Sequence, residues 1–234
     1  MRNSLSLFAI LSLAGPTVPA LAETPKAEVT EKAQFDRALQ MVMSGKPKEA
    51  IPLLDAVIAA NQARHADPAI QVYCARGPAE TLMYMAESAA RGRSAVAVGD
   101  TWCDALFFKG YALFDLGQRE ESRRWIERAV AMAPHNAHYK GELAESYKAA
   151  REWGKAYALF AETAEDARVY SPDDIKNFDL RRALRGMGFV LIEMGKFDEA
   201  TAKFEECLKL DPDDQKAKGE LRFIEEQKAK KAVS

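Results

Sequence analysis

The chain has 234 residues, of which 48% are hydrophobic and 29% are charged, with 13 Gly and 10 Pro. This composition is typical of a folded protein and excludes a chain that is disordered throughout. The net charge of −2 provides no basic surface for nucleic acid or for an anionic membrane.

The first 22 residues, MRNSLSLFAILSLAGPTVPALA, have the pattern of a secretory signal peptide. One cation, Arg2, precedes an apolar segment that is too short to span a bilayer of about 30 Å as a helix. The small residues Ala20 and Ala22 then form a signal-peptidase site. We therefore expect cleavage after Ala22, export to the periplasm and a short linker over residues 23–30. Because no later segment approaches about 18 uninterrupted apolar residues, we expect no stable membrane insertion.

Residues 31–64 are predicted to form a pair of helices. Apolar and small residues recur at helical spacing through FDRALQMVMSGKPKEAIPLLDAVI, and Gly45 ends the first helix. Two helices joined by so short a turn must pack antiparallel.

Residues 65–102 break this pattern and are predicted to be a degenerate unit. The stretch PAETLMYMAESAARG (78–92) is predicted to be its first helix. The stretch SAVAVGDTW (94–102) is β-branched and contains Gly, which makes a poor second helix, so we expect an extended loop there.

The pattern of paired helices returns after residue 102. Residues 103–136 and 181–214 match one another at a constant offset of 78 positions, and residues 137–168 form a further copy between them. The matching pairs are Gly110 and Gly188, Leu113 and Leu191, Gly117 and Gly195, Ile126 and Phe204, Ala129 and Cys207, and Pro134 and Pro212.

Two segments are added to these copies. Residues 169–180 are an insertion, in which Ser171-Pro172-Asp173-Asp174 is predicted to be a turn followed by a helix start, with Ser171 or Asp173 as the cap. Residues 215–234 are predicted to be a capping helix and tail, whose candidate inward-facing residues are Leu221, Ile224 and Phe223. A polar-backed closing helix is expected at the end of a solenoid because the last repeat exposes an apolar side.

These copies resemble the tetratricopeptide repeat (TPR) family, whose unit is a 34-residue helix-turn-helix with alternating small and large positions. The last copy matches best, with Gly188, Ala200, Phe204 and Pro212 all in place. The third copy departs from the family at the inter-helix turn, where Arg151 replaces Gly. The resemblance implies an all-α fold, a right-handed solenoid of antiparallel helix pairs. About four clear repeats and one degenerate unit span 31–214, and the capping helix and tail span 215–234.

The resemblance also implies a concave groove, lined by the first helix of each repeat, that binds a protein or peptide partner. Transferring that geometry gives the following candidate groove residues: Phe107, Tyr111, Phe114, Lys148, Arg182, Arg185 and Phe189. The family's carboxylate clamp uses Lys and Asn, but Phe107 and Tyr111 stand at the relevant pair of positions, so this clamp is not supported. An aromatic wall beside two arginines would suit an apolar segment with an acidic group nearby.

The sequence contains no motif for catalysis or for a cofactor. G-x-S-x-G, H-E-x-x-H, P-loop and G-x-G-x-x-G patterns are all missing. His135 and His138 have no companion ligand at metal-binding spacing, so capping and surface roles are expected. We therefore expect neither an enzyme nor a cofactor or metal. Two classes stay open: an exported scaffold that binds another protein, and a structural solenoid that self-associates or fills its own groove.

Three cysteines follow the signal peptide. Cys74 and Cys103 flank the degenerate unit, and export to an oxidising compartment would allow them to form a disulfide. Cys207 stands at a small buried position of the last repeat and is expected to be a free, inert thiol.

Overall fold

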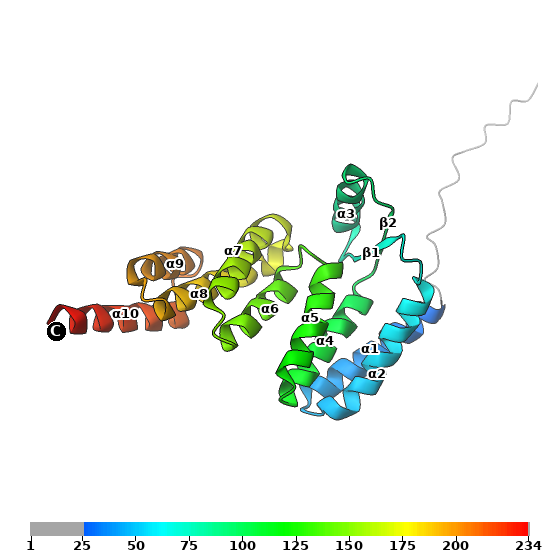
Figure 1. Cartoon of the computed structure of the whole chain (residues 1–234), viewed down its shortest axis with the longest axis horizontal. Coiled ribbons are helices and arrows are strands. Elements are labelled where there is room, and N and C mark those ends of the chain that lie inside the picture. The colour runs from blue at the N-terminus through cyan, green and yellow to red at the C-terminus, as the bar shows by residue number, and fades with distance from the viewer. Residues whose placement is uncertain (1–25, 234) are drawn as a thin grey trace, which may run out of the picture.

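A computed structural model describes residues 26–233, which form ten helices and two short strands. The predicted signal peptide and residues 23–25 of the linker lie outside the described residues, whereas residues 26–30, predicted to be linker, form the beginning of the first helix. Eight helices form four antiparallel pairs, arranged side by side along the molecule (Figure 1). The pairs are α1 (Lys26–Met43) with α2 (Pro47–Arg64), α4 (Thr101–Asp115) with α5 (Arg119–Met132), α6 (Ala137–Ala149) with α7 (Trp153–Tyr170), and α8 (Asp173–Glu193) with α9 (Phe197–Leu210). An all-α solenoid of helix pairs is therefore confirmed.

The turns within the pairs have one backbone geometry. Gly45, Gly117 and Gly195 each follow a first helix with a positive φ of 71°, 78° and 73°. Glycine adopts this left-handed conformation without steric cost and commonly ends a helix in this way. Arg151 adopts a φ of 60° at the same place in the third pair. A side chain there costs roughly 1–2 kcal/mol relative to its right-handed conformation, so the same turn is made at a cost in stability.

Small and large residues fit together between the two helices of a pair. A Cβ atom placed on Gly188 would lie 2.6 Å from the ring of Phe204, which is itself fully buried. The equivalent positions Gly110 and Ile126 show the same 2.6 Å approach. Because no side chain fits between these atoms, the two glycines set how closely the helices of the α4–α5 and α8–α9 pairs approach.

The segment between the first two pairs is not a degenerate helix pair. Strands β1 (Gln71–Cys74) and β2 (Ala95–Val98) form a parallel two-stranded sheet, and α3 (Pro78–Ala90) is the crossover between them. The helix predicted at 78–92 is present, but the predicted loop at 94–102 contains β2 and the start of α4. The β-branched residues that make AVAV a poor helix favour the strand once QVYC pairs with it in register from Gln71–Ala95 to Cys74–Val98.

The second insertion extends helices instead of forming a separate element. It lengthens α7 to 18 residues and α8 to 21 residues. The predicted side-chain cap is wrong, because Pro172 occupies the capping position of α8 and no side chain caps it. Ser171 is buried instead and donates a hydrogen bond of 2.7 Å to Asp179 Oδ2. This bond connects the bend that follows α7 to helix α8.

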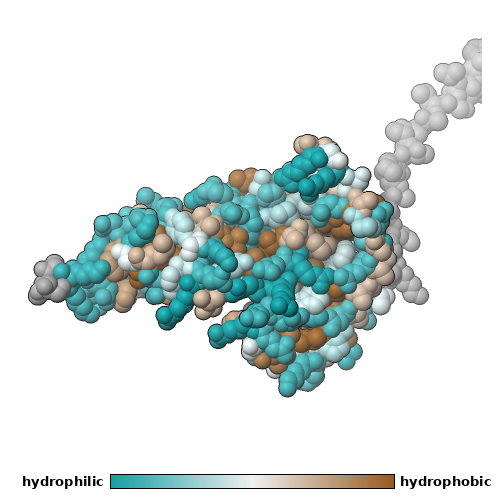
Figure 2. Space-filling model, viewed as in Figure 1, coloured by the Kyte–Doolittle hydropathy of each residue, from teal (hydrophilic) through white to brown (hydrophobic). Residues whose placement is uncertain are grey.

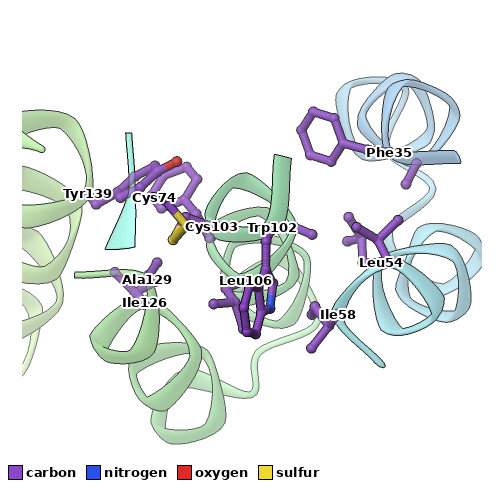
Figure 3. Packing of buried hydrophobic residues seen from close by; sticks show 14 of the residues in the cluster. Phe35, Leu54, Ile58, Cys74, Trp102, Cys103, Leu106, Ile126, Ala129 and Tyr139 are labelled. Carbon is purple, nitrogen blue, oxygen red and sulfur yellow. A yellow bond between two sulfur atoms is a disulfide. The ribbon is translucent and has the colours of Figure 1, made fainter. Parts of the chain in front are cut away.

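The apolar interior is divided into two clusters that meet at α6. The first lies between α1, α2, α4 and α5 and includes Phe35, Leu54 and Leu106 (Figure 3). The second lies between α6, α7, α8, α9 and α10 (Gln215–Val233). Within α10, Ile224 is buried in the second cluster, whereas Phe223 is 42% exposed. Helix α6 contributes Tyr139 to the first cluster and Ala144 to the second, and thereby joins them.

Within the described residues, no helix combines the length and apolar character that a membrane crossing would need.

Candidate binding groove

Two clefts lie along one side of the solenoid and share residues Glu145 and Arg182. Cleft A, of about 680 Å³, lies between α4, α5 and α6. Cleft B, of about 690 Å³, lies between α6, α8 and α10. Since the two clefts share wall residues and are lined by the first helices of successive repeats, they form one groove. In Figure 2 the surface is notched between the lobe of α4 and α5 and the arm that begins with α6.

Helix α6 contacts α4 at one end and lines cleft A at the other. At its N-terminal end α6 is held against α4, where the Tyr139 hydroxyl donates a hydrogen bond to Asp104 and its ring stacks on Phe107 at 4.9 Å between centroids. At its C-terminal end, Ala149 and Ala150 lie across the cleft from Tyr111 and Phe114 of α4. The floor of cleft A is therefore apolar, and its rim carries charged side chains.

Cleft B has aromatic walls. Its lining includes Phe178 and Phe189 of α8 and Phe223 of α10. Phe178 and Phe223 are 52% and 42% exposed, so cleft B presents large apolar side chains to solvent in one place. Burial raises the pKa of Glu220, which lies on α10 in the same cleft, although the Lys148 ammonium partly offsets this effect.

Six of the seven predicted groove residues line the two clefts. Tyr111 and Phe114 line cleft A, Lys148, Arg185 and Phe189 line cleft B, and Arg182 lines both. The assignment of Phe107 is wrong. Its ring is only 2% exposed and packs between Tyr139 and His138, because α6 covers this part of α4.

Three cations of the groove are paired with carboxylates of the chain itself. Arg182 pairs with Glu142, and Arg185 Nη1 lies 2.5 Å from Asp214 Oδ2. Lys148 Nζ lies 2.5 Å from Glu145 Oε2 and 4.8 Å from the centre of the Phe189 ring. The expectation that the two arginines receive an acidic group of a partner therefore loses its basis, because both guanidinium groups already have one.

Several groove residues were not predicted from the sequence. Phe178 lies in the 169–180 insertion, outside the repeat frame, and Phe223 was assigned to the interior of the capping helix. Phe178 has no counterpart in the repeat frame, and Phe223 stands next to the buried Ile224, so an error of one position on α10 places it in the interior. Asp115 and Glu120 of cleft A lie on either side of the Gly117 turn, where the repeat pattern places no constraint.

The contact between α4 and the N-terminal end of α6, which we call the joint, lies next to cleft A and contains titratable groups that are largely removed from water. Burial raises the pKa of the Asp104 carboxyl to about 6, although the hydrogen bond from Tyr139 acts in the opposite direction. Burial also lowers the pKa of His138, and the neighbouring Arg182 adds to that effect. Asn136 caps α6 by accepting hydrogen bonds from the backbone N–H groups of His138 and Tyr139.

The described residues contain no cluster of three or more His, Cys, Asp or Glu side chains with the geometry of a metal site. Cys74 and Cys103 are joined by a disulfide that connects β1 to α4 (Figure 3), and Cys207 is a buried free cysteine. Burial raises the pKa of the Cys207 thiol to about 12, which is the environment of an inert thiol.

Comparison with known families identifies the repeats directly. Models of the tetratricopeptide repeat match residues 104–136 and 181–214. These two segments are the α4–α5 and α8–α9 pairs. A comparison with curated proteins found no match.

Solved structures with the same fold include several repeat proteins. The structure of pilF from Pseudomonas aeruginosa aligns with a TM-score of 0.60 at 14% identity and covers 88% of this chain and 72% of that one. A MamA RS-1 double mutant aligns with a TM-score of 0.56 at 14% identity, covering 85% of each chain. MamA AMB-1 aligns with a TM-score of 0.52 at 20% identity, covering 86% and 84%. At these identities the similarity shows the fold.

Proposed function

We propose that this chain, two of whose helix pairs match the tetratricopeptide repeat, is an exported, non-catalytic scaffold that binds a segment of another protein in its groove. The observation that carries this proposal is the continuous pair of clefts A and B, which holds the exposed aromatic side chains Tyr111, Phe114, Phe178 and Phe223. Exposed aromatic residues in a concave surface are characteristic of binding sites for apolar segments.

The alternative is a solenoid that fills its own groove or self-associates. Within residues 26–233, the first insertion contributes no residue to either cleft, and the second contributes only Phe178, a wall residue of cleft B that is still 52% exposed. The β1-α3-β2 unit packs at the ends of α4 and α5, and the second insertion extends α7 and α8. The clefts are thus accessible from solvent as far as the described residues are concerned, which favours an external partner.

Site-specific photo-crosslinking in intact cells tests this proposal. A photoreactive phenylalanine derivative replaces Phe114 in cleft A or Phe223 in cleft B, and a matched control replaces Leu82, which is 72% exposed on α3 and lines neither cleft. We expect covalent adducts with another protein from both groove positions and none from position 82. Adducts with a second copy of the chain would support the alternative, and no adduct from either groove position would refute a binding role for the groove.

A further inference from the structure

The two clefts differ in charge. Cleft A is lined by five carboxylates and three arginines, whereas cleft B is lined by four cations and two carboxylates. The groove therefore has an acidic end at α4 and α5 and a basic end at α8 and α10. A partner segment that lies along it meets opposite electrostatic environments at its two ends.

Most charges in cleft A are neutralised inside the molecule. Arg123 Nη1 lies 2.9 Å from Glu152 Oε1, and Arg182 pairs with Glu142. Asp115 and Glu120 differ from these, because neither forms an ion pair or a side-chain hydrogen bond within the part of the chain that the structure describes. Both are exposed at the rim of the cleft.

The position of Asp115 is not explained by helix stability. It is the last residue of α4, and no basic residue lies in the last turn of that helix. A carboxylate at the C-terminal end of a helix faces the negative end of the helix dipole, which is unfavourable. A carboxylate retained at such a place, exposed and beside a cleft, is available to bind a cation from outside.

Aromatic rings lie next to these carboxylates. Tyr111 and Phe114 are 40% and 48% exposed on the same helix as Asp115. The guanidinium carbon of Arg119 already lies 6.0 Å from the centre of the Phe114 ring. This contact shows that the aromatic surface accepts a guanidinium group, which is favourable through the cation–π interaction.

We propose that the partner is an apolar segment carrying a Lys or Arg side chain, and that this cation binds in cleft A between the Tyr111 and Phe114 rings and the carboxylates of Asp115 and Glu120. The apolar part of the segment then lies along the groove towards Phe189 and Phe223. This inference rests on the proposed function and adds the chemistry of the partner. It differs from recognition of an acidic peptide terminus, because the groove arginines Arg182 and Arg185 are already paired.

Fluorescence anisotropy with three labelled synthetic peptides tests this inference. The peptides share one apolar segment containing Leu and Trp and carry two Lys, two Gln or two Glu residues at one end. We expect the Lys peptide to bind the full chain at least about fivefold more tightly than the Gln peptide, and the Glu peptide to bind most weakly. The preference should decrease with added salt, because exposed charges are screened.

A charge-reversal variant locates the cation. The Asp115→Lys/Glu120→Lys chain should lose the preference for the Lys peptide while its affinity for the Gln peptide stays within about twofold. The matched control, Glu49→Lys/Glu205→Lys, changes the net charge equally at exposed positions that line neither cleft and should keep the preference. Equal binding of the three peptides, preference for the Glu peptide, or no binding of any peptide would overturn the inference. The photo-crosslinking experiment decides the proposed function separately, since it needs no assumption about the partner's charge.

Discussion

At the scale of single residues, Gly188 opposite Phe204 and Gly110 opposite Ile126 set the distance between the helices of two pairs. A different residue, Asp104, carries a charge that burial makes unfavourable. Its carboxyl lies at the contact between α4 and α6, where it accepts a hydrogen bond from the Tyr139 hydroxyl. Burial disfavours the charged form, so the pKa of the carboxyl rises to about 6 from an unfolded value of about 3.9.

This raised pKa makes stability depend on pH. Between about pH 4 and pH 6 the folded chain binds more protons at Asp104 than the unfolded chain does. The free energy of unfolding contributed by this group therefore decreases as the pH rises through that range, and the penalty is fully present above pH 6. A pKa that is about two higher in the folded than in the unfolded chain lowers the free energy of unfolding by at most about 3 kcal/mol.

We predict that Asp104→Asn stabilises the protein by about 2 kcal/mol at pH 7.5, because the amide oxygen still accepts the Tyr139 hydrogen bond and no charge is buried. The gain should disappear at about pH 3.5, below the unfolded pKa, where the carboxyl is protonated in both the folded and the unfolded chain. Urea unfolding at both pH values measures the difference, and Asp115→Asn, at an exposed position, provides the control. A variant that is less stable than the native chain at pH 7.5, or a gain that does not depend on pH, would contradict this prediction.

At the scale of elements, the β1-α3-β2 unit connects two neighbouring helix pairs of the solenoid. The Tyr73, Tyr84, His135 and Tyr170 rings stack in sequence, which links β1 and α3 to the start of α6 and the end of α7. His135 also places its two ring nitrogens 3.1 Å from Glu87 Oε1 and 2.9 Å from Asp166 Oδ1. The unit is therefore attached to the third repeat by side chains and to α4 by the Cys74–Cys103 disulfide.

We predict that Cys74→Ala/Cys103→Ala loosens this unit more than the rest of the chain. The bond closes a loop with a sequence separation of 29, which corresponds to about 3–4 kcal/mol in the chain-entropy model. Hydrogen exchange followed by mass spectrometry should show faster exchange in residues 65–100 and little change in α8 and α9. The control Cys207→Ala should leave 65–100 unchanged. Equal protection of 65–100 with and without the disulfide would show that the stacked rings alone hold the unit.

The limits of sequence-based prediction follow from the same elements. The helix pairs were predictable because Gly110, Gly188 and the large residues opposite them recur in one frame, and local spacing is enough to show this. The strands were not, because AVAV becomes a strand only when QVYC, distant in sequence, pairs beside it. Phe107 was misplaced for a related reason. The repeat frame assigns it to the concave side, but the tilt of α6 over α4 depends on tertiary packing and covers it.

At the scale of the whole molecule, the groove forms where the two apolar clusters meet. Helix α6 belongs to both clusters and lines both clefts, with α4 and α5 on the side of cleft A and α8 and α10 on the side of cleft B. The Asp104–Tyr139 contact and the His135 contacts fix the angle of α6 at its N-terminal end. The C-terminal end of the same helix lines both clefts, so these contacts and the groove share one element.

The final prediction concerns the compartment in which this molecule folds. The disulfide connects two buried cysteines, and such bonds persist in oxidising compartments and are rare in the cytosol. This agrees with the signal-peptide pattern of residues 1–22, which supports export independently.

We predict that intact-mass analysis of the chain from the periplasmic fraction gives a species that lacks residues 1–22 and retains the bond between Cys74 and Cys103. Ala22→Arg should block cleavage, because the signal peptidase requires a small residue there, whereas Leu21→Ala should not. A full-length chain with free thiols at 74 and 103 would place the protein in the cytosol, and the search for its partner would then move there.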